Sequence, residues 1–158
     1  MKSITYGDVS FKAMSQIIKN YIQSDRNCKY KISIGTDSQN FDVTKVVVVV
    51  AVWKVGNGGI FFYDIKHVDK ISNLQQKIFY ETSLSIELAQ RLSEKFDKED
   101  FKCDMSIHVD IGDDGLTSKM IPEILGWVKS CGFDCNVKPY SYAASSIANK
   151  YSKIGRAS

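Results

Sequence analysis

The sequence predicts an α/β domain in which helices cover both faces of a five-stranded mixed sheet. Residues 46–53 are apolar without interruption, so a strand formed by them has no polar side and needs cover on both faces. The stretch Gly56-Asn57-Gly58-Gly59 is a strong hairpin signal, and a short link also precedes residue 44; together they predict an antiparallel meander of three strands. After residue 70, helical and extended patterns alternate, as they do in α/β folds.

The individual elements follow from their hydrophobic periods. An amphipathic helix at residues 8–24, capped by Asp8 or Ser10, precedes a strand in which Tyr30, Ile32 and Ile34 alternate with polar residues. The sequence has no repeats and no low-complexity linker, so residues 1–158 are expected to form one domain, with 1–28 as a helical extension and 29–153 as the core. The other expected elements are strands at 44–55, 60–68, 105–110 and 134–139 and helices at 73–96, 118–130 and 143–153.

Two aspartates follow strands of the predicted sheet. Asp37 lies in Gly35-Thr36-Asp37-Ser38-Gln39, where small polar residues are not expected to continue the hydrophobic core, and Asp110 ends the fourth strand. Taken alone, Asp37 is well explained as a side-chain cap on a turn. If the fourth strand lies parallel to the first, through a right-handed crossover, both carboxylates reach the edge of the sheet where α/β proteins bind ligands.

Glu81 is the acid that the long helix at residues 73–96 presents to the sheet. Ser72 and Gln75 read as a capping box, and the apolar stripe of the helix includes Glu81, whereas Glu87 lies off the stripe and can pair with Arg91. A buried carboxylate needs a hydrogen-bonding backbone group, a lysine or a metal ion beside it. Three carboxylates at one place repel each other unless a cation neutralises them, and oxygen ligands favour Mg²⁺ or Mn²⁺.

Composition and charge narrow the class of protein. The 158 residues carry a net charge of +3, and no acidic residue follows Asp134 although Lys138, Lys150, Lys153 and Arg156 do. This basic ending indicates a phosphate-bearing partner or a solvated helix end. Neither a signal peptide pattern nor a membrane-length apolar run occurs, so we expect a cytoplasmic protein without a membrane partner and with its four cysteines reduced. The sequence does not indicate an oligomeric state.

Four motifs carry a resemblance to a known family. They are Gly-Thr-Asp-Ser-Gln at 35–39, Tyr-Glu-Thr at 80–82, His-Val-Asp-Ile-Gly at 108–112 and Lys-Pro-Tyr-x-x-x-Ala-Ser-Ser-x-Ala-Asn-Lys-Tyr-x-Lys at 138–153. In these motifs the chain resembles the YkuK-type proteins of the ribonuclease H-like superfamily. The resemblance implies a ribonuclease H fold, with the five strands in the order 3-2-1-4-5.

The resemblance also implies a reaction. Asp37, Glu81 and Asp110 match the acids that bind two divalent ions in that superfamily, so Mg²⁺ or Mn²⁺ is the expected cofactor. The implied function is hydrolysis of phosphodiester bonds in nucleic acid, in which one ion activates a water molecule and the other stabilises the leaving oxygen. The sequence does not distinguish DNA from RNA as the substrate.

The last helix departs from the superfamily pattern. Many such nucleases carry a fourth acid there, and residues 143–158 contain none, so Asp113, Asp114 or His108 are the expected substitutes. A catalytically weak or inactive nucleic-acid-binding or scaffold domain is therefore the alternative function. The residues expected to contact phosphates or bases are Ser38, Gln39, Lys138, Tyr140, Ser145, Ser146, Asn149, Lys150 and Lys153.

Overall fold

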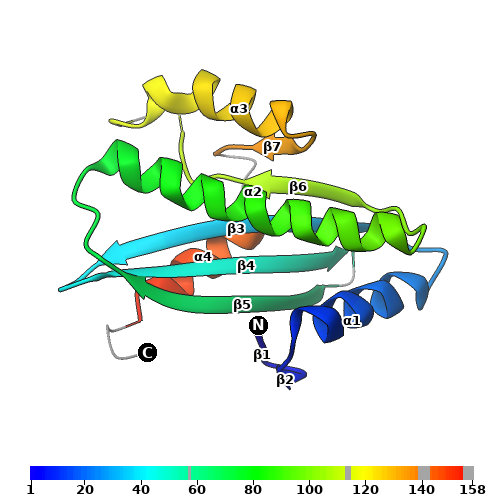
Figure 1. Ribbon diagram of the computed structural model, residues 1–158. Coiled ribbons are helices and arrows are strands. Elements are labelled where there is room, and N and C mark those ends of the chain that lie inside the picture. Colours follow the sequence, from blue (N-terminus) through cyan, green and yellow to red (C-terminus); the bar gives the residue numbers. More distant parts are fainter. Residues whose placement is uncertain (57, 113–114, 139–142, 155–158) are drawn as a thin grey trace.

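A single β-sheet separates one helix from the other helices in the computed structural model (Figure 1). The structure describes residues 1–56, 58–112, 115–138 and 143–154, and of Ala143 and Ser145 it describes the backbone alone. The strands are β1 (Lys2–Ser3), β2 (Gly7–Asp8), β3 (Tyr30–Asn40), β4 (Thr44–Lys54), β5 (Gly59–Val68), β6 (Asp104–His108) and β7 (Asp134–Asn136). The helices are α1 (Phe11–Gln23), α2 (Leu74–Lys98), the 3₁₀ turn η1 (Ser118–Met120), α3 (Ile121–Ser130) and α4 (Ala143–Ser152).

Within the described residues the sheet has seven strands, in the order β2-β1-β5-β4-β3-β6-β7. The prediction of five strands missed the hairpin of β1 and β2, which joins the edge of the sheet where Lys2 pairs with Tyr63. Strands of two residues are too short to show an alternating pattern. Strands β3, β4 and β5 pair antiparallel, whereas β6 pairs parallel with β3 and with β7.

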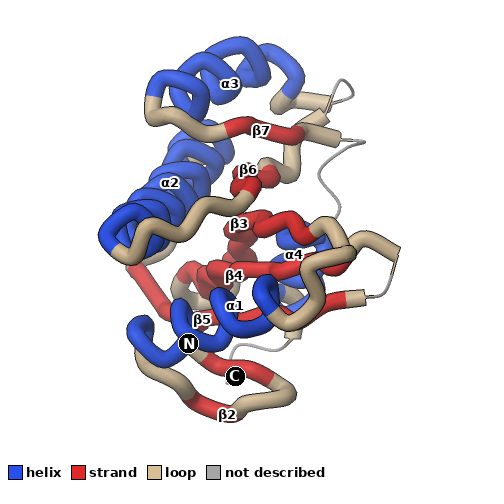
Figure 2. Tube along the Cα trace, turned by 90° about the vertical axis from the view of Figure 1, so that its right-hand side faces the viewer, coloured by secondary structure: helices blue, strands red, loops and turns tan. Residues whose placement is uncertain are grey.

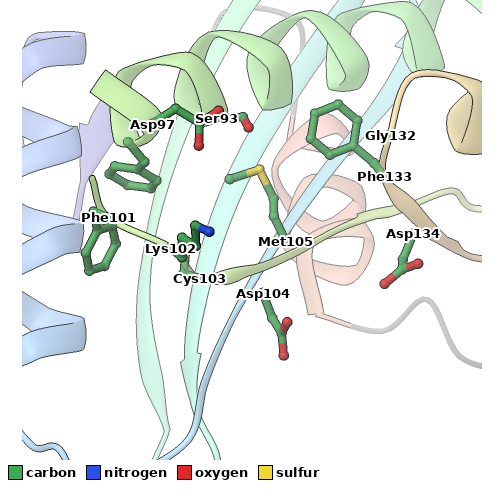
Figure 3. Close-up of a pocket in the computed structure, with 11 residues that line it drawn as sticks. Ser93, Asp97, Phe101, Lys102, Cys103, Asp104, Met105, Gly132, Phe133 and Asp134 are labelled. Carbon is green, nitrogen blue, oxygen red and sulfur yellow. The ribbon is translucent and has the colours of Figure 1, made fainter. Parts of the chain in front are cut away.

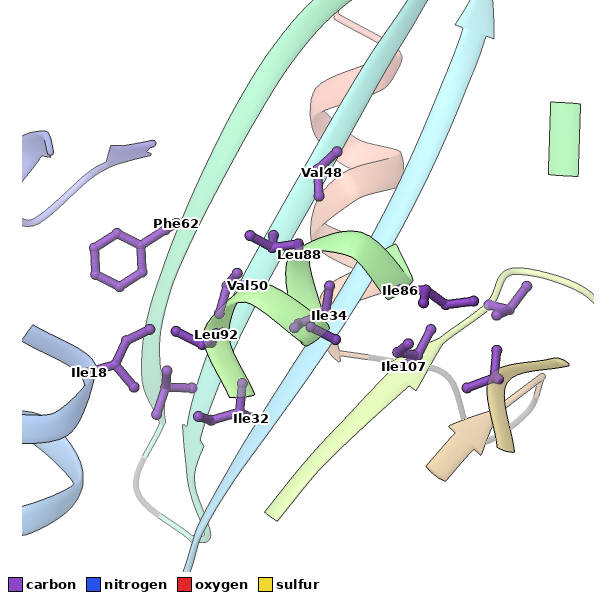
Figure 4. Close-up of a cluster of buried hydrophobic side chains, with 14 of the residues drawn as sticks. Ile18, Ile32, Ile34, Val48, Val50, Phe62, Ile86, Leu88, Leu92 and Ile107 are labelled. Atoms are coloured by element: carbon purple, nitrogen blue, oxygen red, sulfur yellow. The ribbon is translucent and has the colours of Figure 1, made fainter. Parts of the chain in front are cut away.

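The valine run explains why helices lie on both sides of the sheet. Alternate residues of β4 point to opposite faces, so Val46, Val48 and Val50 join the larger apolar cluster under α2, while Val47 and Val49 join a smaller cluster under α4. Figure 2 shows the sheet between these two helices. The larger cluster also takes in side chains of α1 and α3, and part of it is drawn in Figure 4.

Strand β3 is longer than its sequence pattern indicates. Residues 35–39 were expected to leave the sheet, yet β3 continues to Asn40 because its backbone pairs with β4 as far as the Asn40–Thr44 pair. The parallel pairing with β6 stops earlier, at the pair formed by Gly35 and His108. The polar residues 36–39 are therefore an extended, largely buried segment next to the carboxyl end of β6.

Helix α2 begins one residue later than its predicted capping box. Asn73, not Ser72, is the N-cap, and its side-chain oxygen accepts a 2.9 Å hydrogen bond from the N–H of Gln76. A cap three residues before its N–H partner is the usual geometry, and Asn is as good a cap as Ser. No helix in the described ranges has the length and apolar content needed to cross a membrane.

Candidate functional site

Asp37 lies on the face of the sheet that α4 covers. It pairs with Val47, whose side chain belongs to the cluster under α4, so both side chains point to that side. The residue is 7% exposed, and its Oδ2 accepts a 2.5 Å hydrogen bond from the Oγ of Ser152, the last residue of α4. Burial raises the pKa of Asp37; the hydrogen bond from Ser152 lowers it, and the charge of Asp110 raises it further.

Glu81 approaches the neighbouring residue of β3 from the other face. Ser38 pairs with Val46 of the α2-side cluster, and its hydroxyl donates a 2.5 Å hydrogen bond to Oε2 of Glu81 on α2. Burial raises the pKa of Glu81 to about 8. The hydrogen bond from Ser38 opposes this rise, whereas the charges of Asp37 and Asp110 add to it.

Asp110 stands beyond the carboxyl end of β6. The last parallel pair of β3 and β6 is formed by Gly35 and His108. Asp37 follows Gly35 by two residues, and Asp110 follows His108 by two residues. Asp37 and Asp110 are therefore at the same level of the sheet. The side chain of Asp110 is 29% exposed, and its Oδ1 is 3.0 Å from the Nζ of Lys138, with which it forms an ion pair.

The three carboxylates lie near one another, but each is bound to a different side chain: Asp37 to Ser152, Glu81 to Ser38 and Asp110 to Lys138. They were expected to converge on one point; the structure brings them within electrostatic range, with Asp37 and Glu81 on opposite faces of the sheet. In the part of the chain that the structure describes, no three His, Cys, Asp or Glu side chains are grouped so as to hold a metal ion. Asp113 and Asp114, the proposed supporting ligands, lie outside the described residues.

Two residues of this site were missed by the sequence reasoning. Lys77, one helical turn before Glu81, lowers the pKa of both Glu81 and Asp37 through its charge. Its i, i+4 spacing from Glu81 was the signal that could have identified it. Ser152 was missed because nothing in the sequence of α4 distinguishes it from Ser145 or Ser146.

His108 is buried on the α4 side of the sheet. It pairs with Gly35, and Gly35 pairs with Val49 of the α4-side cluster. Its Nε2 lies 3.2 Å from both the Ser106 hydroxyl and the side-chain amide of Asn136. Burial lowers the pKa of His108 to about 4, so the imidazole is neutral at pH 7.

The residues predicted to bind nucleic acid are distributed unevenly. Ser38 is buried against Glu81, and Lys138 is exposed while paired with Asp110. Tyr140 and the side chain of Ser145 lie outside the described residues. Gln39 and Asn149 are partly exposed, whereas Ser146, Lys150 and Lys153 are exposed, which leaves a basic surface at the end of α4 near Asp37.

A pocket of about 360 Å³ lies far from these acids, at the opposite ends of α2 and β6. Figure 3 shows its lining, which combines Phe101, Met105 and Phe133 with Asp97, Asp104 and Asp134. The three aspartates are exposed, and no metal-binding group is found among them or elsewhere in the described ranges. Their separation from Asp37 and Glu81 excludes this pocket from the candidate site.

Comparisons with known proteins agree with this arrangement of elements. A family model described as Ribonuclease H-like matches residues 13–153. The uncharacterized protein YkuK of Bacillus subtilis (strain 168) is 31% identical over 164 residues, which cover 96% of this chain and 95% of that protein. No solved structure matches the chain significantly. With matches that span nearly its whole length, the chain belongs to the YkuK-type family of ribonuclease H-like proteins.

Proposed function

We propose that this protein is a divalent-metal-dependent nuclease that hydrolyses phosphodiester bonds of nucleic acid, with Asp37, Glu81 and Asp110 as its catalytic acids. One observation carries the proposal. Asp37, Glu81 and Asp110 come from a strand, a helix and a loop that are far apart in sequence, yet Glu81 contacts Ser38, the residue next to Asp37, and Asp110 stands at the level of Asp37. Burial raises the pKa of Asp37 and of Glu81, and the charges of the neighbouring acids raise both further. Gathering like charges in a buried place is costly, and a bound cation removes that cost.

The donor atoms present suit a hard cation. All three candidate ligands are carboxylates, with hydroxyl oxygens from Ser38 and Ser152 beside two of them. Such oxygen-only surroundings favour Mg²⁺ or Mn²⁺ over the softer metals. Ser152 contacts Oδ2 of Asp37, Ser38 contacts Oε2 of Glu81, and Lys138 contacts Oδ1 of Asp110. The other oxygen of each carboxylate is the proposed ligand atom.

Each residue has a defined task in this proposal. When bound, the metal supplies an activated water and neutralises the charge on the reacting phosphate. Asp37, Glu81 and Asp110 would hold the metal, and Asp113 and Asp114 are proposed to support them. Ser38 and Ser152 fix the orientation of two of these carboxylates. Because Asp37 is buried and Glu81 partly so, the protein also keeps bulk water away from the ligands.

Substrate binding is assigned to the basic surface at the end of α4. Lys150 and Lys153 are exposed there and are proposed to neutralise phosphates, with Lys138 beside Asp110. Gln39, Ser146 and Asn149 are proposed to donate or accept hydrogen bonds along the strand, with Tyr140 and Ser145 as further proposed contacts. Both DNA and RNA remain candidate substrates, because phosphate contacts alone do not discriminate between them.

Cleavage assays test the proposal directly. Labelled DNA, RNA and DNA–RNA hybrids are incubated with the wild type and with Asp37→Asn, in the presence of Mg²⁺ or Mn²⁺. The proposal expects metal-dependent cleavage that falls by at least about 100-fold in Asp37→Asn, since each catalytic acid supplies several kcal/mol of stabilisation. Equal cleavage by the two proteins, or cleavage that persists in a chelator, would contradict it.

A second function is favoured by a separate observation. Each of the three acids already has a protein donor, namely Ser152, Ser38 or Lys138, so the described structure satisfies them without a cation. This arrangement suits a nucleic-acid-binding or scaffold domain that does not cleave. Such a domain would bind oligonucleotides in a salt-sensitive manner, would not bind Mn²⁺ at millimolar concentration and would be insensitive to Asp37→Asn.

A further inference from the structure

The end of helix α4 makes two buried polar contacts with the sheet. Ser152 is fully buried, and its hydroxyl lies 2.5 Å from Oδ2 of Asp37 and 3.1 Å from the carbonyl oxygen of Asn149. A serine hydroxyl has one proton, and the shorter contact is to the carboxylate. The helix therefore fixes one of the two oxygens of Asp37.

Lys45 holds the same helix end from the neighbouring strand. Its Nζ donates 2.9 Å hydrogen bonds to the carbonyl oxygens of Tyr151 and Ile154, which stand on either side of Ser152 in the chain. The residue is 0% exposed, which is rare for a lysine. A lysine at a helix C-terminus satisfies carbonyls that have no partner within the helix, and its charge is favourable there. The ammonium group thus sets where Ser152 lies.

Aromatic packing also holds this end of α4 against the sheet. The ring of Tyr151 stacks on that of Tyr63 in β5, with centroids 4.4 Å apart and planes 17° apart, and it also meets Phe61 at 6.1 Å. Ser152 follows Tyr151 directly, so this stack fixes the chain at the residue before the contact with Asp37. Hydrogen bonds and packing on both sides of Ser152 leave its hydroxyl little freedom.

We propose that Ser152 is a positioning residue for Asp37, and that Lys45 keeps it in place, so that the last turn of α4 does structurally what an acidic ligand on that helix would do by charge. The inference rests on the proposed metal-dependent function. It assigns a role to the end of α4, a helix that carries no acid. The hydroxyl occupies Oδ2 of Asp37 and leaves the other oxygen oriented for the cation.

Two variants, Ser152→Ala and Lys45→Met, separate the proposal from simpler explanations, because the expected change in Mn²⁺ affinity has the opposite sign. If Ser152 merely blocked Asp37, Ser152→Ala would bind Mn²⁺ more tightly. If Lys45 acted only through its charge, Lys45→Met would also bind Mn²⁺ more tightly, because a nearby positive charge repels a cation. Under the proposal both variants bind Mn²⁺ more weakly, since partners that orient a metal ligand are typically worth about 10- to 100-fold in metal affinity.

The test measures Mn²⁺ affinity of the full chain by the electron paramagnetic resonance signal of free Mn²⁺. We expect Ser152→Ala to weaken binding by about tenfold or more, and Ser152→Thr, which keeps the hydroxyl, to stay within about threefold of the wild type. Ser130→Ala is the matched control, because Ser130 also ends a helix and donates to the carbonyl three residues before it, at 2.6 Å, without meeting an acid. Its Mn²⁺ affinity should equal that of the wild type.

Lys45→Met is examined in the same titration, with hydrogen exchange as a second readout. We expect faster exchange in α4 alone and weaker Mn²⁺ binding. If this variant does not fold, the Ser152 series decides. Unchanged or tighter binding by folded Ser152→Ala would overturn the inference while leaving the proposed function in place. A wild type that binds no Mn²⁺ would overturn both.

Discussion

The two faces of the sheet differ in the kinds of side chain that they bury. Under α2, the face is a broad apolar layer to which β3, β4, β5 and β6 all contribute, and it continues to α1 and α3 (Figure 4). Under α4, the buried apolar cluster has five members within the described residues, Val47, Val49, Ala51, Ala144 and Ala148. The same face also buries Asp37, Lys45 and His108.

The two faces therefore depend on different kinds of interaction. Apolar contacts are additive and tolerate small shifts, whereas buried polar groups require a partner at a fixed distance. Ser33 illustrates the cost. It pairs with Ala51 of the α4-side cluster, and its buried hydroxyl has no hydrogen-bond partner among the described residues. A face that accepts such costs is better suited to holding a reactive site than to stabilising the fold.

The largest expected effect tests the apolar face. Leu92 belongs to α2 and is fully buried against the sheet, and Leu92→Ala should lower the free energy of unfolding by about 3 kcal/mol or more, from lost burial and the cavity left behind. Urea unfolding gives the value. Gln90→Ala, at an exposed position of the same helix, is the control and should change stability by less than about 0.5 kcal/mol. A loss below about 1 kcal/mol in Leu92→Ala would show that the layer repacks freely.

The next effect concerns the one candidate acid on the α2 side. Between its ordinary pKa and about 8, folded Glu81 keeps a proton that the unfolded chain has released, so stability falls as the pH rises through that window. Without divalent ions the wild type should lose on the order of 2 kcal/mol more than Glu81→Gln between pH 5 and 8. Melting curves across this range measure it. Parallel curves for the two proteins would show that Glu81 ionises normally.

A third effect has the opposite pH dependence and belongs to the α4 side. The pKa of His108 is lowered to about 4, so this imidazole stays neutral in the folded protein at pH values below 6.5, where the unfolded chain binds a proton. Its contribution to stability is complete above that pH and is lost as the pH falls toward 4. The wild type should lose about 1.5 kcal/mol more than His108→Gln between pH 7 and 5. An equal loss in both proteins would assign the acid sensitivity to other groups.

Sequence patterns predicted the elements of both faces, because periodicity reports burial. The valine run required two covered faces, and the structure provides them. The patterns did not predict that residues 36–39 stay in β3, since this depends on pairing with β4 and not on hydrophobicity. The hairpin of β1 and β2 was missed because strands of two residues carry no period.

The candidate site was harder to predict than the fold. Residue types and spacing indicated Asp37, Glu81 and Asp110, which lie near one another, but the alternation of β3 places Asp37 and Ser38, the partner of Glu81, on opposite faces. That consequence was available from the period-two rule once the strand was known to extend past Gly35. The contact between Ser152 and Asp37 joins residues 115 positions apart, and the contacts of Lys45 join residues more than 100 positions apart. No local sequence pattern predicts such contacts.

The smallest expected effect compares the two faces at adjacent residues of one strand. Val50 and Val49 are both fully buried, the first under α2 and the second under α4. Val50→Ala should cost about 1 kcal/mol more than Val49→Ala in urea unfolding, because α4 is short and meets Val49 through small residues, so it can settle into the gap. Equal costs would mean that α4 cannot move toward the sheet. The polar contacts at its last turn, and not the apolar cluster beneath it, would then determine its position.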